Sequence, residues 1–141
     1  MHVLIPVDGS ANCLRALQYV LDHRDIFGAP PQITLINVHL PVPSSLAKAW
    51  LGRDVVDQYY AEEALTALAP AREILLKHHV AATEIWTVGE PSVEISKAAQ
   101  THGCQMIVMG THGRTALGNL VMGSVATRVV AEAQIPVLLI K

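Results

Sequence analysis

Short runs of β-branched and large apolar residues alternate along the chain with segments of helical periodicity. The runs lie at residues 3–7, 33–40, 83–88, 105–110 and 135–140. Several are almost uninterrupted, which is typical of parallel strands that are buried on both faces. Five such strands separated by four helical segments predict an α/β fold, in which an open, doubly wound parallel sheet carries helices on both faces and resembles a Rossmann fold.

Turn and capping residues predict where the first two helices begin and end. The first is expected to begin after Ser10, whose hydroxyl suits an N-cap, and to end near Gly28. The second is expected over about residues 54–79, after a loop over residues 41–52 that is longer than a crossover requires. Pro70 lies inside this second helix and is expected to kink or restart it.

The last two helices are marked by proline and glycine. The third is expected to open at residues 89–92, with Pro91 in its first turn, and to close near Gly103. The fourth is expected to begin between residues 117 and 123 and to end before Ile135. These elements account for residues 1–141 as one domain, without internal repeats or linkers.

Length, composition and charge narrow the class of protein. The chain has 141 residues, 51% of them hydrophobic and 16% charged, which is too apolar for a disordered chain. No apolar run is long enough to span a bilayer, and the N-terminus does not read as a secretory signal, so we expect a cytoplasmic protein that does not bind membranes. A net charge of −2 without a basic cluster argues against nucleic acid as a partner. Cys13 and Cys104 lack metal-ligand spacing and are expected to be reduced thiols.

Two predicted strands end in sequences that suggest a ligand site. Asp8, Gly9 and Ser10 follow the first strand. At the end of the fourth strand, residues 110–124 have the sequence GTHGRTALGNLVMGS, which contains four glycines. Ligands of open α/β sheets bind at the carboxyl ends of the strands, where the strand order reverses. Glycine permits positive φ and close approach of backbone amides, and the first amides of the following helix attract anions. Amides at Gly123 and Ser124, with the Ser124 hydroxyl, are therefore predicted to bind phosphate.

The glycine spacing matches one known signature. Residues Gly110, Gly113, Gly123 and Ser124 fit the pattern G-x2-G-x9-G-[ST], which resembles the ATP-binding signature of universal stress proteins. It is neither a P-loop nor a G-x-G-x-x-G motif. The resemblance extends over nearly the whole chain, because the opening VLIPVDGS, LINVH, GEPSVEISKAA, VMGTHGR, GSVATRVV and the closing IPVLLI occur in the expected order.

The resemblance implies a five-stranded parallel sheet, with ATP held across the ends of its first and fourth strands. Adenine would lie near Pro6, Val7 and the backbone of Val38, and ribose near Asp8 and the backbone of Met109 and Gly110. The phosphates would lie over Gly113, Arg114, Gly123, Ser124 and Val125. Mg²⁺ would arrive with the nucleotide and take Asp8 as a ligand, and residues 135–140 of the last strand would form a homodimer.

Several residues with an expected ligand-binding role could instead have a purely structural one. Asp8 could simply initiate the turn into the first helix, and Arg114 could be a solvated turn residue. His112 lies inside the expected phosphate loop and could donate to a phosphate oxygen or be merely exposed. The loop over residues 41–52 could cover the nucleotide or extend the dimer surface, and its Trp50 could equally pack under the long second helix.

The resemblance favours a regulatory or protective stress-response protein that responds to nucleotide, acting with protein partners that the sequence does not identify. No catalytic residue is assigned, because the chain lacks a Walker lysine and a kinase catalytic loop. The segment Asp8-Gly9-Ser10-Ala11 also departs from the Ser-Gly-Gly loop of the related α-hydrolase enzymes. The alternatives are a weak ATPase or phosphotransferase, and a stress protein that acts by protein contacts without nucleotide.

Overall fold

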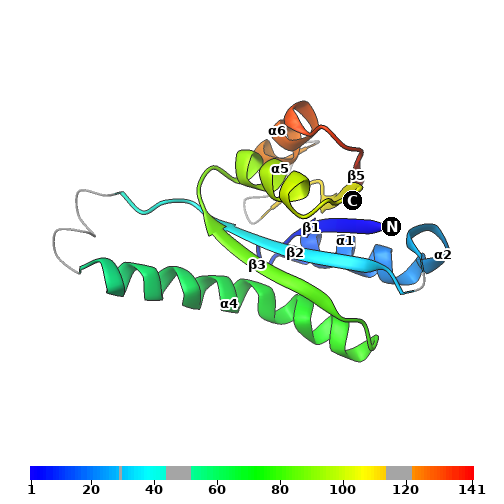
Figure 1. Ribbon diagram of the computed structural model, residues 1–141, viewed down its shortest axis with the longest axis horizontal. Coiled ribbons are helices and arrows are strands. Elements are labelled where there is room, and N and C mark those ends of the chain that lie inside the picture. The colour runs from blue at the N-terminus through cyan, green and yellow to red at the C-terminus, as the bar shows by residue number, and fades with distance from the viewer. Residues whose placement is uncertain (29, 44–51, 114–121) are drawn as a thin grey trace.

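The computed structural model describes residues 1–28, 30–43, 52–113 and 122–141 (Figure 1). In these ranges the strands are β1 (His2–Pro6), β2 (Gln32–His39), β3 (Ala82–Val88), β4 (Met106–Gly110) and β5 (Val137–Ile140). The helices are α1 (Ala11–Asp22), α2 (Arg24–Phe27), α4 (Arg53–Lys77), α5 (Pro91–Thr101) and α6 (Ser124–Glu132). The predicted strands are therefore confirmed, with ends that shift by one or two residues.

The strands form one parallel sheet in the order β3-β2-β1-β4-β5. The chain builds one half of the sheet outward from β1 through β2 to β3, and then returns to the other side of β1 with β4. The strand order therefore reverses between β1 and β4, which is the point where doubly wound folds bind ligands. This topology confirms the predicted fold class.

Side chains that alternate along β1 separate two hydrophobic cores. Val3 and Ile5 pack in the core that lies under α1, α2 and α4, whereas Leu4 packs in the core beneath α5 and α6. Figure 1 shows the same two helical layers on opposite faces of the sheet. All three side chains are fully buried, because β1 is the central strand and is covered on both faces.

The first predicted helix is divided into two. Ser10 caps α1 as expected, and its hydroxyl accepts a hydrogen bond from the Cys13 amide at 3.4 Å. However, α1 ends at Asp22, and the short helix α2 follows after His23, which has φ −115° and ψ 47°. The expectation of one helix that reaches Gly28 is therefore wrong. The change of direction places Phe27, which is 1% exposed, in the core.

The second predicted helix is continuous where a break was expected, and its bounds lie within two residues of those expected. Helix α4 runs for 25 residues from Arg53 to Lys77 without a restart at Pro70 (Figure 1). Proline removes one backbone hydrogen bond of the helix. Before Pro70, Leu68 is buried in the core, and after it Ala71 and Leu75 are buried in the same core. This packing compensates for the missing bond, so the expected restart does not occur.

The remaining helices begin where the sequence indicates. Pro91 is in the first turn of α5, and α6 begins at Ser124, directly after Gly123. Trp50 and the greater part of the long loop lie outside the described residues. Among the described residues, no helix is both long and apolar enough to cross a membrane.

Candidate functional site

A cleft of about 650 Å³ opens at the carboxyl ends of β1, β2 and β4, between the start of α5 and the start of α6. This volume lies within the usual range for small-molecule sites. Ten of the eleven residues expected to contact nucleotide line this cleft. They are Pro6, Val7, Asp8, Val38, Met109, Gly110, Gly113, Gly123, Ser124 and Val125. The exception, Arg114, lies outside the described residues. The fold thus brings the expected residues into one cavity, and their contacts with a ligand remain a prediction.

Hydrogen bonds fix the turn after β1 at the base of the cleft. Asp8 Oδ1 accepts the amide of Ser10 at 2.9 Å, so Asp8 initiates the turn into α1 while it also lines the cleft. The buried Asn37 side chain donates to the Val7 carbonyl at 2.8 Å, and the Val7 amide donates to the Ile36 carbonyl at 2.8 Å. Two neighbouring residues of β2 therefore hold the backbone of Val7 in place.

The N-terminus of α6 faces the cleft without a side-chain cap. Gly123 is the N-cap residue, and it has no side chain to satisfy the first amides of the helix. Its carbonyl accepts from the Thr127 amide at 3.0 Å and from the Thr127 hydroxyl at 2.9 Å. Because the first amides of a helix have no acceptors within the helix, those of Ser124 and Val125 can donate to a ligand in the cleft. The helix dipole favours an anion at this position.

Glycine at positions 110, 113 and 123 permits close packing within the protein and is not required by unusual backbone angles. Glycine permits positive φ, but Gly110, Gly113 and Gly123 are not among the described residues that have it. A Cβ at Gly110 would lie 2.9 Å from the backbone of Asn12 in α1. A Cβ at Gly113 would lie 2.9 Å from Asp8 Oδ2, and one at Gly123 would lie 3.2 Å from the Thr111 carbonyl oxygen.

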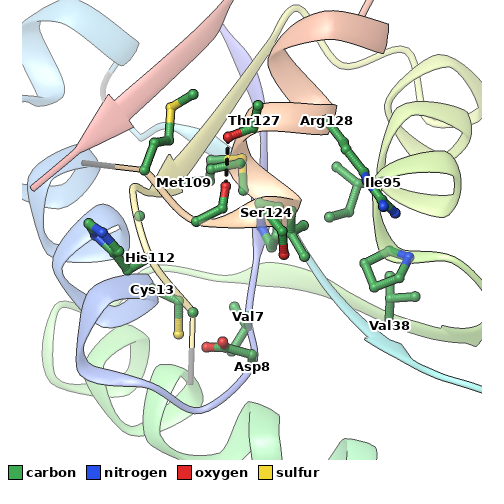
Figure 2. Close-up of a pocket in the computed structure, with 18 of the residues that line it drawn as sticks. Val7, Asp8, Cys13, Val38, Ile95, Met109, His112, Ser124, Thr127 and Arg128 are labelled. Carbon is green, nitrogen blue, oxygen red and sulfur yellow. Dashed lines mark hydrogen bonds between the residues drawn. The ribbon is translucent and has the colours of Figure 1, made fainter. Parts of the chain in front are cut away.

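Two sides of the cleft differ in chemistry (Figure 2). Val38, Ile95 and Arg128 lie together on one side, and Asp8 and His112 lie on the other, with Ser124 between them. The first side is largely apolar apart from the Arg128 guanidinium, which suits a flat aromatic base. Ser124 and the first amides of α6 are central, where they suit a phosphate.

Sequence reasoning missed part of the lining. The additional residues are Cys13, Ile36, Pro91, Ile95, Met122, Ala126 and Arg128. His112 was considered in advance and lines the cleft, as does Thr127, although its place one turn after Ser124 had suggested an ordinary helix surface residue. Arg128 follows Ser124 by one helical turn, so helical spacing could have placed both on one face. Ile95 and Pro91 could not have been found in this way, because α5 reaches the cleft only through the crossover that follows β3.

Burial suppresses the reactivity of the thiol in the cleft. Cys13 Sγ donates to the Ser10 carbonyl at 3.0 Å, and the side chain is 5% exposed. Desolvation by burial raises the pKa of the Cys13 thiol. The thiol is therefore protonated at neutral pH and packs as a small apolar group in the wall of the cleft.

The cleft fits Mg²⁺ only as a companion of phosphate. No group of three or more His, Cys, Asp or Glu side chains that could hold a metal occurs in the described ranges. Asp8 contributes a carboxylate to the lining, and a carboxylate has several acceptor sites on its two oxygens. One carboxylate is sufficient when phosphate oxygens and water supply the other Mg²⁺ ligands.

Comparison with known proteins identifies the family. The model of the universal stress protein family matches residues 1–141. The chain belongs to the universal stress protein family. A relative from Methanocaldococcus jannaschii, universal stress protein MJ0531, is 30% identical over 140 residues, which cover 99% of this chain and 81% of that protein.

Solved structures of other universal stress proteins share the fold. The structure of universal stress protein MJ0577 from Methanocaldococcus jannaschii has a TM-score of 0.82 at 26% identity, and the match covers 99% of this chain and 94% of that chain. The Archaeoglobus fulgidus universal stress protein in complex with dAMP has a TM-score of 0.70 at 24% identity and covers 100% of this chain and 98% of its own. The sheet order 3-2-1-4-5 is that of the universal stress proteins and the adenine nucleotide α-hydrolases.

Proposed function

We propose that this universal stress protein binds ATP with Mg²⁺ in the cleft and acts in the cytoplasm as a nucleotide-dependent regulatory or protective module. The observation that carries the proposal is the uncapped N-terminus of α6, which presents Ser124 and open amides to a cleft at the strand reversal. Amides, a hydroxyl and the helix dipole together favour a phosphate. The dAMP complex of the Archaeoglobus fulgidus relative supports an adenine nucleotide as the ligand.

The chemistry of the two sides of the cleft suggests the orientation of the nucleotide. The base would lie beside Val38 and Ile95, and the ribose would lie near Asp8 and Met109. The phosphates would lie over Gly113, Gly123, Ser124 and Val125, and Arg114 is proposed to contact them from the segment outside the described residues. Mg²⁺ would neutralise phosphate charge next to Asp8, where the carboxylate would otherwise repel the ligand.

Calorimetric titration of nucleotide-free protein with Mg·ATP tests this proposal. We expect one site per chain with micromolar affinity, which corresponds to about −8 kcal/mol. Ser124→Ala is expected to weaken ATP binding about tenfold, because it removes a hydrogen bond to a charged group, and to leave adenosine binding unchanged. Thr101→Ala, an exposed hydroxyl at the end of α5, is the matched control.

Each alternative function predicts a different result of the same experiment. No heat and no thermal shift up to millimolar ATP would favour a stress protein that acts by protein contacts alone. Steady release of phosphate that is lost in Asp8→Ala would favour a weak ATPase. Stoichiometric binding without release would support the regulatory role.

We further propose that β5 forms a homodimer through residues 135–140. Among the described residues, β5 is the edge strand of the sheet and pairs with β4, so its outer edge carries backbone groups that no described strand pairs with. Val137–Ile140 are apolar and half-buried, and such an edge is prone to pair with another chain. Light scattering should give the mass of two chains, and the mass of one chain at micromolar concentration would remove the proposal.

A further inference from the structure

The sequence signature leaves Arg128 without a role, but the structure places it in the wall of the cleft. Arg128 projects from α6 one turn after Ser124 and lies on the same side of the cleft as Ile95 and Val38 (Figure 2). Asp8 and His112 lie on the opposite side. The guanidinium is therefore beside the apolar part of the cleft rather than beside the turn that is expected to hold Mg²⁺.

An ion pair joins this guanidinium to Glu90, the N-cap residue of α5. Arg128 Nη1 donates to Glu90 Oε1 at 2.9 Å, and Glu90 immediately precedes Pro91, which also lines the cleft. The two side chains are 60% and 43% exposed. A pair this exposed contributes little to folding stability, and it places the guanidinium beside Glu90 at the start of α5.

We propose that Arg128, held by Glu90, covers the base of the bound nucleotide and so determines base affinity rather than phosphate affinity. This inference rests on the proposed nucleotide site. Arginine has a planar, weakly hydrated cation that stacks on aromatic faces, and a neighbouring purine supplies such a face. The Glu90 contact occupies one edge of the guanidinium and leaves its flat faces available to the base. Glu90 is then a positioning residue that acts through Arg128.

The competing role for an arginine in a nucleotide cleft is direct pairing with phosphate. The two roles differ in which ligands they affect. An arginine that contacts the base contributes equally to adenosine and ATP, whereas an arginine that contacts phosphate contributes to ATP alone. They also differ toward lysine, which keeps the charge but has no planar group to stack.

The test compares the dissociation constants of adenosine and Mg·ATP by calorimetry for wild type and four variants. Arg128→Gln removes the charge and the planar cation, and Arg128→Lys removes only the planar group. Glu90→Gln removes the anchor, and Arg53→Gln, an exposed cation at the start of α4, is the matched control. Urea unfolding of each variant without nucleotide verifies that the fold is unchanged.

We expect Arg128→Gln to weaken adenosine and ATP binding by the same factor, about threefold to tenfold. Arg128→Lys should weaken the binding of both ligands nearly as much. Glu90→Gln should weaken binding by a smaller factor that is equal for adenosine and ATP, and Arg53→Gln should bind both ligands as wild type does. Unchanged binding in Arg128→Gln, a loss for ATP only, or full rescue by lysine would overturn the inference. Wild-type protein that binds neither ligand would instead overturn the proposed nucleotide site itself.

Discussion

At the amino ends of the strands, polar groups of the protein hydrogen-bond to one another, whereas at the carboxyl ends they surround a cleft. His2 Nε2 lies 2.8 Å from Thr34 Oγ1. The His2 amide donates to Gln105 Oε1 at 2.9 Å, and the Gln105 amide donates to the His2 carbonyl at 2.8 Å. At the other end, Gly123 leaves the first amides of α6 without a side-chain cap. The same sheet therefore has a closed end, where polar groups pair within the protein, and an open end, which leads into the cleft proposed to bind nucleotide.

The difference shows how this fold separates two requirements. Buried polar groups that pair within the protein stabilise the native state, because no donor is left unsatisfied. Donors that await a ligand contribute nothing to folding until the ligand arrives, when binding stabilises the native state by mass action. Substitutions at the two ends should consequently have different signatures in stability and in binding.

Gly110→Ala should have the largest effect, because it disrupts the packing on which the open end is built. A Cβ at Gly110 would lie 2.9 Å from backbone atoms of Asn12, which cannot move without moving α1. Overpacking of this kind should lower the free energy of unfolding by about 1–3 kcal/mol, measured by urea denaturation.

Gly113→Ala is the control for this prediction. Its Cβ would lie 2.9 Å from Asp8 Oδ2, the same distance as for Gly110, but this atom is at the end of a side chain and not in the backbone. The carboxylate can shift, so the stability loss should be about 1 kcal/mol or less, and the effect should fall on Mg·ATP affinity instead. Equal destabilisation by the two substitutions would show that contact with backbone does not decide the cost.

His2 should make the closed end sensitive to acid. Burial, followed by the nearby His102 and the N-terminal amine, lowers the pKa of His2 below its usual 6.5. The unfolded chain therefore takes up the proton first, so stability is fully present above about pH 6.5 and falls as pH drops from there toward the lowered pKa. His2→Gln should reduce this dependence in urea unfolding between pH 8 and pH 5.5, and an unchanged pH profile would count against the role of His2.

The two cysteines offer the smallest and most direct comparison of the two ends. Cys13 lines the cleft and is 5% exposed, while Cys104 is 6% exposed, and its Sγ lies 3.7 Å from His2 Nε2 at the closed end. Burial raises the pKa of both thiols, so both should react slowly with an alkylating reagent near neutral pH. Mg·ATP should slow the labelling of Cys13 further and leave Cys104 unchanged, as followed by mass spectrometry. Equal protection of both thiols would indicate global stabilisation rather than occupancy of the cleft.

Patterns that are local in the sequence predicted much of the fold. The strand at residues 3–7 could be recognised because β1 is buried on both faces, and Ser10 and Pro91 marked helix starts because capping and the first turn depend on neighbouring residues. Pro70 and Gly28 were misleading for the same reason. Tertiary packing of α4 overrides the proline, and His23 ends α1 before the glycine is reached.

The candidate site divides in the same way. The glycine spacing and the Asp8–Ser10 turn were visible in the sequence, because both lie within the segments that follow β1 and β4. The contribution of Ile95 to the wall of the cleft was not visible in the sequence, because it depends on how α5 packs after the crossover. Nor could the sequence show that Gly110 and Gly113 are required by contacts with Asn12 and Asp8, residues about a hundred positions away.

The sequence by itself determined the order of strands and helices, the parallel sheet and the segment that resembles a nucleotide signature, because hydrophobic periodicity and turn chemistry act over a few neighbouring residues. Only the tertiary structure decided that β4 returns beside β1, that α5 and α6 flank one cleft, and that Glu90 holds Arg128 there. These features depend on which buried faces pack together across the sheet, and that choice is made by the whole core rather than by any one segment.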